Sequence, residues 1–230
     1  LFRHLVLSRL TFPLSKLKTS EYLLRYQNVV VEVDSIYRYL DKLESQREVV
    51  QRISFEHTLR LFDGKISIVF YDVTTLYFEA SDEDDLRKTG FSKEGKHQHP
   101  QIVLGLLVSL YGYPLAFEIY EGNKFEGHTL IPVVEGFKQK YKLDKLVVIA
   151  DAGLLSGENV SELLKNGYEF ILGARIKNES HALKKEILAH RYTDGHSIVL
   201  KRDESTNLIV SFATARARKD EHNRQRGLSK

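Results

Sequence analysis

The sequence predicts an α/β fold built on a mixed sheet, in which three antiparallel strands are followed by an alternation of helices and strands. Two observations predict it. Strand-like runs separated by turn signals succeed one another between residues 66 and 120, and helical and strand-like segments alternate from residue 129. A mainly helical segment precedes this core, and a β-rich segment and a basic tail follow it.

The first segment, residues 1–63, is expected to be helical. Ile36, Leu40 and Leu43 have helical spacing, and a further helix is expected from about Arg47 to Leu61. Basic side chains are scattered through this segment, at Arg3, Arg9, Lys16, Lys18, Arg25, Arg38 and Lys42. They are typical of a solvated helical face, and they also fit a small helical module that contacts DNA.

Three strands are predicted from runs of β-branched and aromatic residues. They cover Ile66–Phe78, about Gln101–Leu110, and Leu115–Tyr120. The turn signal Tyr111-Gly112-Tyr113-Pro114 separates the second strand from the third. These strands should therefore form an antiparallel meander.

Beyond the meander the period changes again. We expect a helix over Thr129–Tyr141, a strand over Lys145–Ala150, a helix from Ser156 to about Asn166, and a strand over Tyr168–Ala174. The order β-β-β-α-β-α-β describes a ribonuclease H-like sheet. In such a sheet the first strand lies beside the fourth.

The remaining chain is predicted to be a β-rich insertion, residues 178–215, and a truncated basic tail, residues 216–230. A short helix over His181–His190 and strands over His196–Lys201 and Asn207–Thr214 form an insertion or an extension of the sheet. The tail has no apolar face and cannot be a finished core element. The ribonuclease H-like core is then residues 64–177, the first part of a catalytic domain.

Composition restricts the class of protein. The chain has 230 residues, of which 42% are hydrophobic and 28% are charged, as in a globular protein. A net charge of +3 is compatible with a polyanionic partner. The absence of cysteine excludes disulfides, thiolate zinc sites and cysteine nucleophiles. There is also no methionine, so either the start has been processed away or the chain is an internal piece of a longer protein. We expect the internal piece, because the far end also looks cut. No membrane-length apolar run or signal peptide is evident.

Two aspartates at the expected ends of hydrophobic strands point to chemistry. Asp72 follows Ile66–Tyr71, and Asp151 follows Lys145–Ala150. An ionised aspartate inside an apolar strand costs stability unless it is paired, whereas at a strand end it can meet a metal ion. Neighbouring first and fourth strands would bring both carboxylates to one Mg²⁺ site. From spacing alone, a turn or capping aspartate and a plain loop aspartate remain alternatives.

Five blocks of sequence resemble DDE transposases of the insertion-sequence type, in the group with a β-rich insertion in the catalytic core. Each block alone is a weak signal, but five in order at fitting spacing are specific. The resemblance is strongest over about Ile66–Lys177. The blocks are Tyr71–Glu79; Gly90–Lys93 running on to Pro100–Leu106; Gly122-Asn123 with Thr129-Leu130; Ala150–Leu154 with Ser156 and Asn159; and Gly167-Tyr168 with Phe170–Gly173.

The resemblance implies that Asp72 and Asp151 are the first two catalytic carboxylates and ligands of a two-metal Mg²⁺ site, in which Mn²⁺ can substitute. It also implies double-stranded DNA as the partner, both transposon ends and target, and a homodimer on paired ends. The family's third carboxylate is a glutamate in a tyrosine–two–arginine–three–glutamate pattern. Neither Tyr168 nor Tyr192 begins that pattern. We therefore expect a fragment that is inactive on its own.

Five further residues are candidates for DNA binding. Lys93, Lys96 and His97 lie in a basic loop that is either merely exposed or contacts phosphate near the cut site. Asn123 is either a left-handed turn asparagine or, by the resemblance, a polar group close to the active site. Arg175 is a structural residue or a contact to the DNA backbone.

The predicted function is DNA transposition by metal-dependent strand cleavage and strand transfer at insertion-sequence ends. The missing glutamate favours one alternative, a truncated DNA-binding remnant without catalysis. A ribonuclease H-like nuclease without strand transfer is a second alternative, against which the basic helices and the inserted strands argue. The expected location is cytoplasmic and nucleoid-associated.

Overall fold

The computed structural model describes residues 1–91, 95, 97–143 and 145–228. Its helices are α1 (Phe2–Thr11), α2 (Lys16–Gln27), α3 (Val33–Glu44), α4 (Arg47–Leu61), α5 (Leu130–Tyr141), α6 (Gly157–Lys165), α7 (His181–Ala189) and α8 (Thr214–Leu228), with 3₁₀ turns η1 (Glu126–His128) and η2 (Ile176–Asn178). Its strands are β1 (Ile68–Tyr77), β2 (Gln101–Ser109), β3 (Pro114–Glu121), β4 (Val147–Ala150), β5 (Glu169–Leu172), β6 (Ser197–Lys201) and β7 (Asn207–Ser211).

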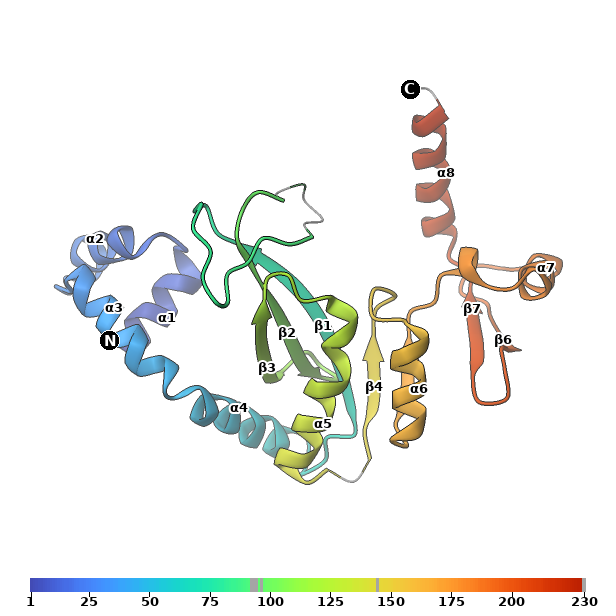
Figure 1. The fold of residues 1–230 in the computed structure, drawn as a ribbon, viewed down its shortest axis with the longest axis horizontal. Coiled ribbons are helices and arrows are strands. Elements are labelled where there is room, and N and C mark those ends of the chain that lie inside the picture. Colours follow the sequence, from blue (N-terminus) through green and yellow to red (C-terminus); the bar gives the residue numbers. More distant parts are fainter. Residues whose placement is uncertain (92–94, 96, 144, 229–230) are drawn as a thin grey trace.

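Five strands form one mixed sheet in the order β3-β2-β1-β4-β5 (Figure 1). The pairs β1–β2 and β2–β3 are antiparallel, whereas β1–β4 and β4–β5 are parallel. The predicted meander and the predicted placement of the first strand beside the fourth are therefore confirmed. This is the sheet of the ribonuclease H-like fold.

The core fills the space between one face of this sheet and helices α4, α5 and α6. Val69 and Tyr71 of β1 and Val148 of β4 are buried on that face. They belong to one cluster with Phe137 of α5 and Leu163 of α6. Burying apolar side chains of this size contributes roughly 1.5–3 kcal/mol each, so this cluster holds the strands that carry the two aspartates in place.

The N-terminal segment is helical, as predicted, and α4 joins it to the core. Phe55 of α4 stacks on Tyr141 at 3.7 Å between ring centroids. Arg47 donates a hydrogen bond to the carbonyl oxygen of Phe117 in β3 at 3.2 Å and forms an ion pair with Glu118. The helix therefore packs on the meander as well as on α5.

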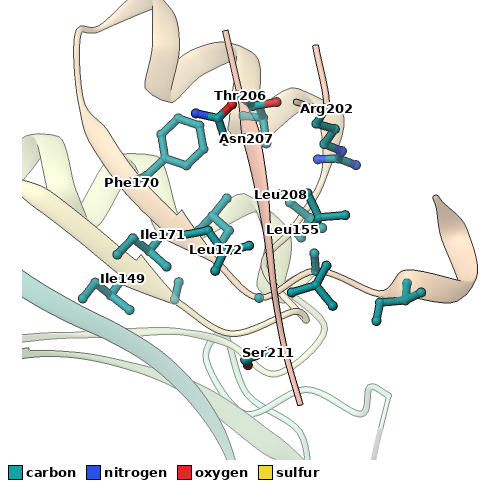
Figure 2. Close-up of a pocket in the computed structure, with 17 residues that line it drawn as sticks. Ile149, Leu155, Phe170, Ile171, Leu172, Arg202, Thr206, Asn207, Leu208 and Ser211 are labelled. Carbon is teal, nitrogen blue, oxygen red and sulfur yellow. The ribbon is translucent and has the colours of Figure 1, made fainter. Parts of the chain in front are cut away.

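Strands β6 and β7 form a separate two-stranded sheet with its own small core, so they do not extend the main sheet. Glu179 anchors this hairpin, because its nearly buried carboxylate pairs with Arg202 at 3.1 Å. A cavity of about 600 Å³ lies between β5 and β7, and Figure 2 shows the residues that line it. Both strands border this cavity with apolar side chains, among them Ile171 and Leu208.

The basic tail forms a helix, α8, which is not predicted from the sequence. None of its residues is buried, in agreement with the absence of an apolar face. In Figure 1 it projects away from the hairpin. Within the described ranges, no helix combines the length and the apolar character that crossing a bilayer requires.

Candidate active site

Strand register places the two aspartates next to each other. Tyr71 of β1 pairs with Ala150 of β4 in the parallel ladder. Asp72 and Asp151 are the residues that follow this pair in the chain, Asp72 within β1 and Asp151 directly after β4. β4 ends at Ala150, whereas β1 continues to Tyr77. The prediction that Asp72 lies at the end of its strand is therefore wrong, because Asp72 lies within β1. Asp151 lies at the predicted strand end.

Each of the two carboxylates has one oxygen held by the backbone. The amide of Val73 donates to Oδ1 of Asp72 at 2.8 Å, and the amide of Gly153 donates to Oδ1 of Asp151 at 2.8 Å. Both residues are exposed, and within the described part of the chain neither Oδ2 accepts a hydrogen bond. One oxygen of each carboxylate is thus available to a cation, while the other fixes the orientation of the side chain.

Asp72 faces away from the hydrophobic core. Side chains alternate along a strand, so Asp72 lies on the opposite face from its buried neighbours Tyr71 and Val73. Leu106 pairs with Asp72 on the same face and is 38% exposed. Ile171, which alternation places on this face in β5, is 55% exposed. Asp72 is therefore reached from the open face of the sheet.

The loop that carries Asp151 is fixed by its neighbours. The buried side chain of Asn159 donates to the carbonyl oxygen of Leu154 at 2.8 Å. Ser156 caps α6, because its hydroxyl accepts a hydrogen bond from the amide of Asn159 at 3.0 Å. A Cβ atom at Gly173 would lie 2.7 Å from the amide nitrogen of Ala152, so the absence of a side chain there lets β5 approach this loop closely.

A cavity of about 600 Å³ lies beside Asp151. Asn123 and Arg175, two of the predicted DNA-binding residues, line it together with Asp151. Asp72 does not line this cavity. Thr75 lines it, and alternation places Thr75 on the opposite face of β1 from Asp72. Asp151 therefore borders both the cavity and the face that carries Asp72.

Gln101 joins the two loops that form this cavity. Its side chain is 1% exposed, and its Nε2 donates to the carbonyl oxygens of Gly122 at 2.8 Å and Phe91 at 3.1 Å. Its backbone exchanges two hydrogen bonds with Lys88, at 2.9 and 3.1 Å. One buried residue thus connects the loop after β1 to the turn after β3.

Two glycines allow these loops to touch. A Cβ atom at Gly90 would lie 2.3 Å from the carbonyl oxygen of Gly122, and one at Gly122 would lie 2.1 Å from the carbonyl oxygen of Gln101. Neither distance is possible for real atoms, and the obstacles are backbone. This close approach requires glycine at both positions of this chain.

The structure places the remaining candidates as follows. Among the described residues, Asn123 is not one of those with a positive φ, so the reading of a left-handed turn asparagine is wrong. His97 is exposed, lies 6.1 Å from Phe91 between ring centroids, and does not line the cavity. Lys93 and Lys96 lie outside the described residues.

The carboxylates of Asp72 and Asp151 supply two of the ligands that a divalent cation would need. Mg²⁺ binds through one or two carboxylates and keeps several waters, and Asp72 and Asp151 offer two exposed carboxylates on adjacent strands. Within the described ranges, no three His, Cys, Asp or Glu side chains gather closely enough to hold a metal. A third side-chain ligand is therefore not found among those residues.

Comparison with known families agrees with the topology. The family model of the transposase DDE domain matches residues 63–229. This chain belongs to the DDE-domain transposases. A search of curated protein sequences finds no match.

The DDE-domain chain also has similarities among solved structures. It is similar to the piggyBac transposase in a synaptic complex with hairpin DNA, with 13% identity and a TM-score of 0.47, over 88% of this chain and 45% of that one. It is similar to the Mos1 transposase in a paired-end complex with the left transposon end, with 12% identity and a TM-score of 0.33, over 81% of this chain and 68% of that one.

A Mos1 mariner paired-end complex with Mn has 14% identity and a TM-score of 0.31, over 73% of this chain and 56% of that one. The chain thus spans about half the length of the piggyBac chain. All three TM-scores lie below 0.5, and family membership rests on the family match alone.

Sequence reasoning missed Gln101. The signal was present, because a glutamine that opens an otherwise apolar strand must find hydrogen-bond partners if it is buried. Its partners are carbonyl groups of loops remote in sequence, so the pattern alone could not name them.

Proposed function

We propose that this chain acts in DNA transposition, in which DNA strands are cleaved at insertion-sequence ends and joined to target DNA. Family membership supports the assignment to transposition. The observation that supports a cutting and joining centre is the register of β1 and β4, because it sets Asp72 beside Asp151.

In this proposal, Asp72 and Asp151 hold divalent cations through the oxygens that the backbone leaves available, with Mg²⁺ as the cofactor and Mn²⁺ as a substitute. Cations held there would supply positive charge that lowers the pKa of an attacking water or 3′-hydroxyl and stabilises the leaving oxygen. The amides of Val73 and Gly153 keep the two carboxylates oriented. Preorganisation of this kind matters because an error of about 1 Å in a reacting group costs about 10²-fold in rate.

The partner in this proposal is double-stranded DNA, at transposon ends and at the target. Asn123 and Arg175 would contact its phosphates beside Asp151, since both line the adjoining cavity. Lys93, Lys96 and His97 remain candidates on the preceding loop. We further propose a homodimer on paired ends, a nucleoid-associated location, and functional segments at residues 1–63, 64–177, 178–215 and 216–230.

The experiment is metal-dependent nicking of supercoiled plasmid by the full-length protein and by its Asp72→Asn and Asp151→Asn variants, with Asp82→Asn in the exposed acidic loop as a control of equal charge change. Both active-site variants should lose at least about 100-fold in nicking rate, since they remove a metal ligand. The control should nick as the wild type does. Undiminished nicking by Asp72→Asn would refute the assignment.

A DNA-binding protein without catalysis is the second candidate. The observation that favours it is that, among the described residues, no third carboxylate joins Asp72 and Asp151. It predicts DNA binding by the wild type without any metal-dependent nicking. The same plasmid assay, read together with a binding assay, separates the two candidates.

A further inference from the structure

Helix α8 is fixed at its beginning and exposed along the rest of its length. The amide of Thr214 donates to Oδ1 of Asp194 at 2.7 Å, and this hydrogen bond keeps the pKa of Asp194 below its usual range. The ionised carboxylate suits this end of a helix, where the amides carry partial positive charge. None of the residues of α8 is buried. The helix therefore has a set origin and an open surface.

The charges of α8 are sorted onto different faces. The two acidic residues are paired within the helix, Asp220 with Arg216 at 3.6 Å and Glu221 with Arg224 at 3.9 Å. Arg218 and Lys219 form no ion pair within the described part of the chain. His222 lies four and three residues after them, and Arg226 lies four residues after His222. Residues at this spacing share a helical face. Of the two acidic residues, Glu221, three residues after Arg218, borders this face, and its carboxylate is paired with Arg224.

This composition restricts what can cover α8. A helix that packs on protein needs an apolar stripe, and α8 has none. A helix of 15 residues is only marginally stable when isolated, so a partner that binds it through charge also stabilises it. The face formed by Arg218, Lys219, His222 and Arg226, hereafter the basic face, is complementary to a polyanion.

We propose that α8 docks on duplex DNA through its basic face and holds the phosphate backbone. The face extends about 12 Å from Arg218 to Arg226 at the helical rise of about 1.5 Å per residue. Over that length a duplex presents several phosphates, at about one charge per 1.7 Å of axis. The choice of DNA among polyanions rests on the proposed function.

The test compares two double variants of the same helix, Arg218→Gln/Lys219→Gln on the basic face and Arg216→Gln/Arg224→Gln on the paired face. Each removes two positive charges, and glutamine has a helix propensity close to that of arginine and lysine. Circular dichroism shows whether the fold of each is retained. Binding to a 30-bp duplex is then measured from 50 to 300 mM salt in EDTA, so that cleavage plays no part.

The slope of log K against log salt should become shallower by about 1.8 for the basic-face variant, about 0.9 for each lost phosphate contact. The paired-face variant should change the slope by less than half as much. On DNA binding by the wild type, the amides of residues 217–226 should gain protection from hydrogen exchange, because the helix is unpacked when free.

Equal changes of the salt slope in both variants, or no change in either, would overturn the docking of α8. Tighter binding of the basic face to phosphatidylserine vesicles than to duplex DNA would also overturn it. Salt-dependent DNA binding by the wild type would in those cases leave the proposed function standing. A wild-type chain that does not bind DNA at all would instead refute the proposed function together with the docking.

Discussion

Replacing the amide of Gln101 by a carboxylate tests how the loops beside the candidate active site are held together. Gln101→Glu keeps the size and shape of the side chain but exchanges the Nε2 donor for an oxygen. That oxygen would face the carbonyl oxygens of Gly122 and Phe91, which now accept at 2.8 and 3.1 Å. The residue is 1% exposed, so water cannot replace the lost donor.

The cost can be worked from the titration of the new carboxyl. Burial and two facing carbonyls disfavour its charged form, and the pKa of a fully buried carboxyl rises by up to about 3–5. The usual pKa of Glu is about 4.3. If the pKa in the folded state is about 2.5 higher, the free energy of unfolding falls by about 3 kcal/mol at pH 7. A folded pKa above the unfolded pKa means that this loss is relieved as the pH falls. At pH 5 about 1 kcal/mol remains.

The assay is urea unfolding of wild type and variant at pH 7 and pH 5, with Gln139→Glu on the exposed surface of α5 as the matched control. Hydrogen exchange of the Lys88 amide, which donates to the backbone of Gln101 at 3.1 Å, reports on the loop itself. An equal loss at both pH values, or no loss relative to the control, would refute the reasoning.

Two further changes test the packing around the site. Gly105→Ala should lower the free energy of unfolding by about 1–3 kcal/mol, because its Cβ would lie 2.3 Å from the hydroxyl of the buried Tyr71. The control is Gly136→Ala in α5, whose Cβ would meet nothing within 4 Å and should raise the free energy of unfolding by about 0.5–1 kcal/mol. Equal effects of the two variants in urea unfolding would contradict this. Arg202→Ala should lower the free energy of unfolding by about 1–3 kcal/mol, because it leaves the nearly buried carboxylate of Glu179 unpaired, while water screens the partly exposed arginine. The control is Lys201→Ala, at an exposed position. If thermal unfolding does not separate the two variants, the ion pair does not anchor the hairpin.

The strand order could be predicted from the sequence because each strand of the core is a short apolar run with its own turn signal. Alternation of helix and strand after Thr129 left few topologies for a parallel strand beside the first one. The adjacency of Asp72 and Asp151 followed from that order alone. The extent of the first strand was predicted to within two residues at each end, but Asp72 was wrongly placed at a strand end, because β1 continues through Val73-Thr74-Thr75 beyond the point where its parallel neighbour ends.

The organisation of the loops could not be predicted, because it depends on contacts between residues far apart in sequence. The hydrogen bonds from Gln101 to Phe91 and Gly122 cross ten and twenty-one positions. The hairpin β6–β7 could have joined the main sheet, and only its tertiary contacts show that it forms a separate one. Helix α8 lacks the apolar periodicity on which helix prediction depends.

Titration of Mn²⁺ into the chain shows whether Asp72 and Asp151 share a metal site, as we propose. Paramagnetic broadening of NMR signals should reach the amides of both Val73 and Gly153, which donate to the two carboxylates. Asp72→Asn or Asp151→Asn should remove the broadening at both places together. Broadening at only one of the two amides, or broadening that survives either substitution, would contradict a shared site.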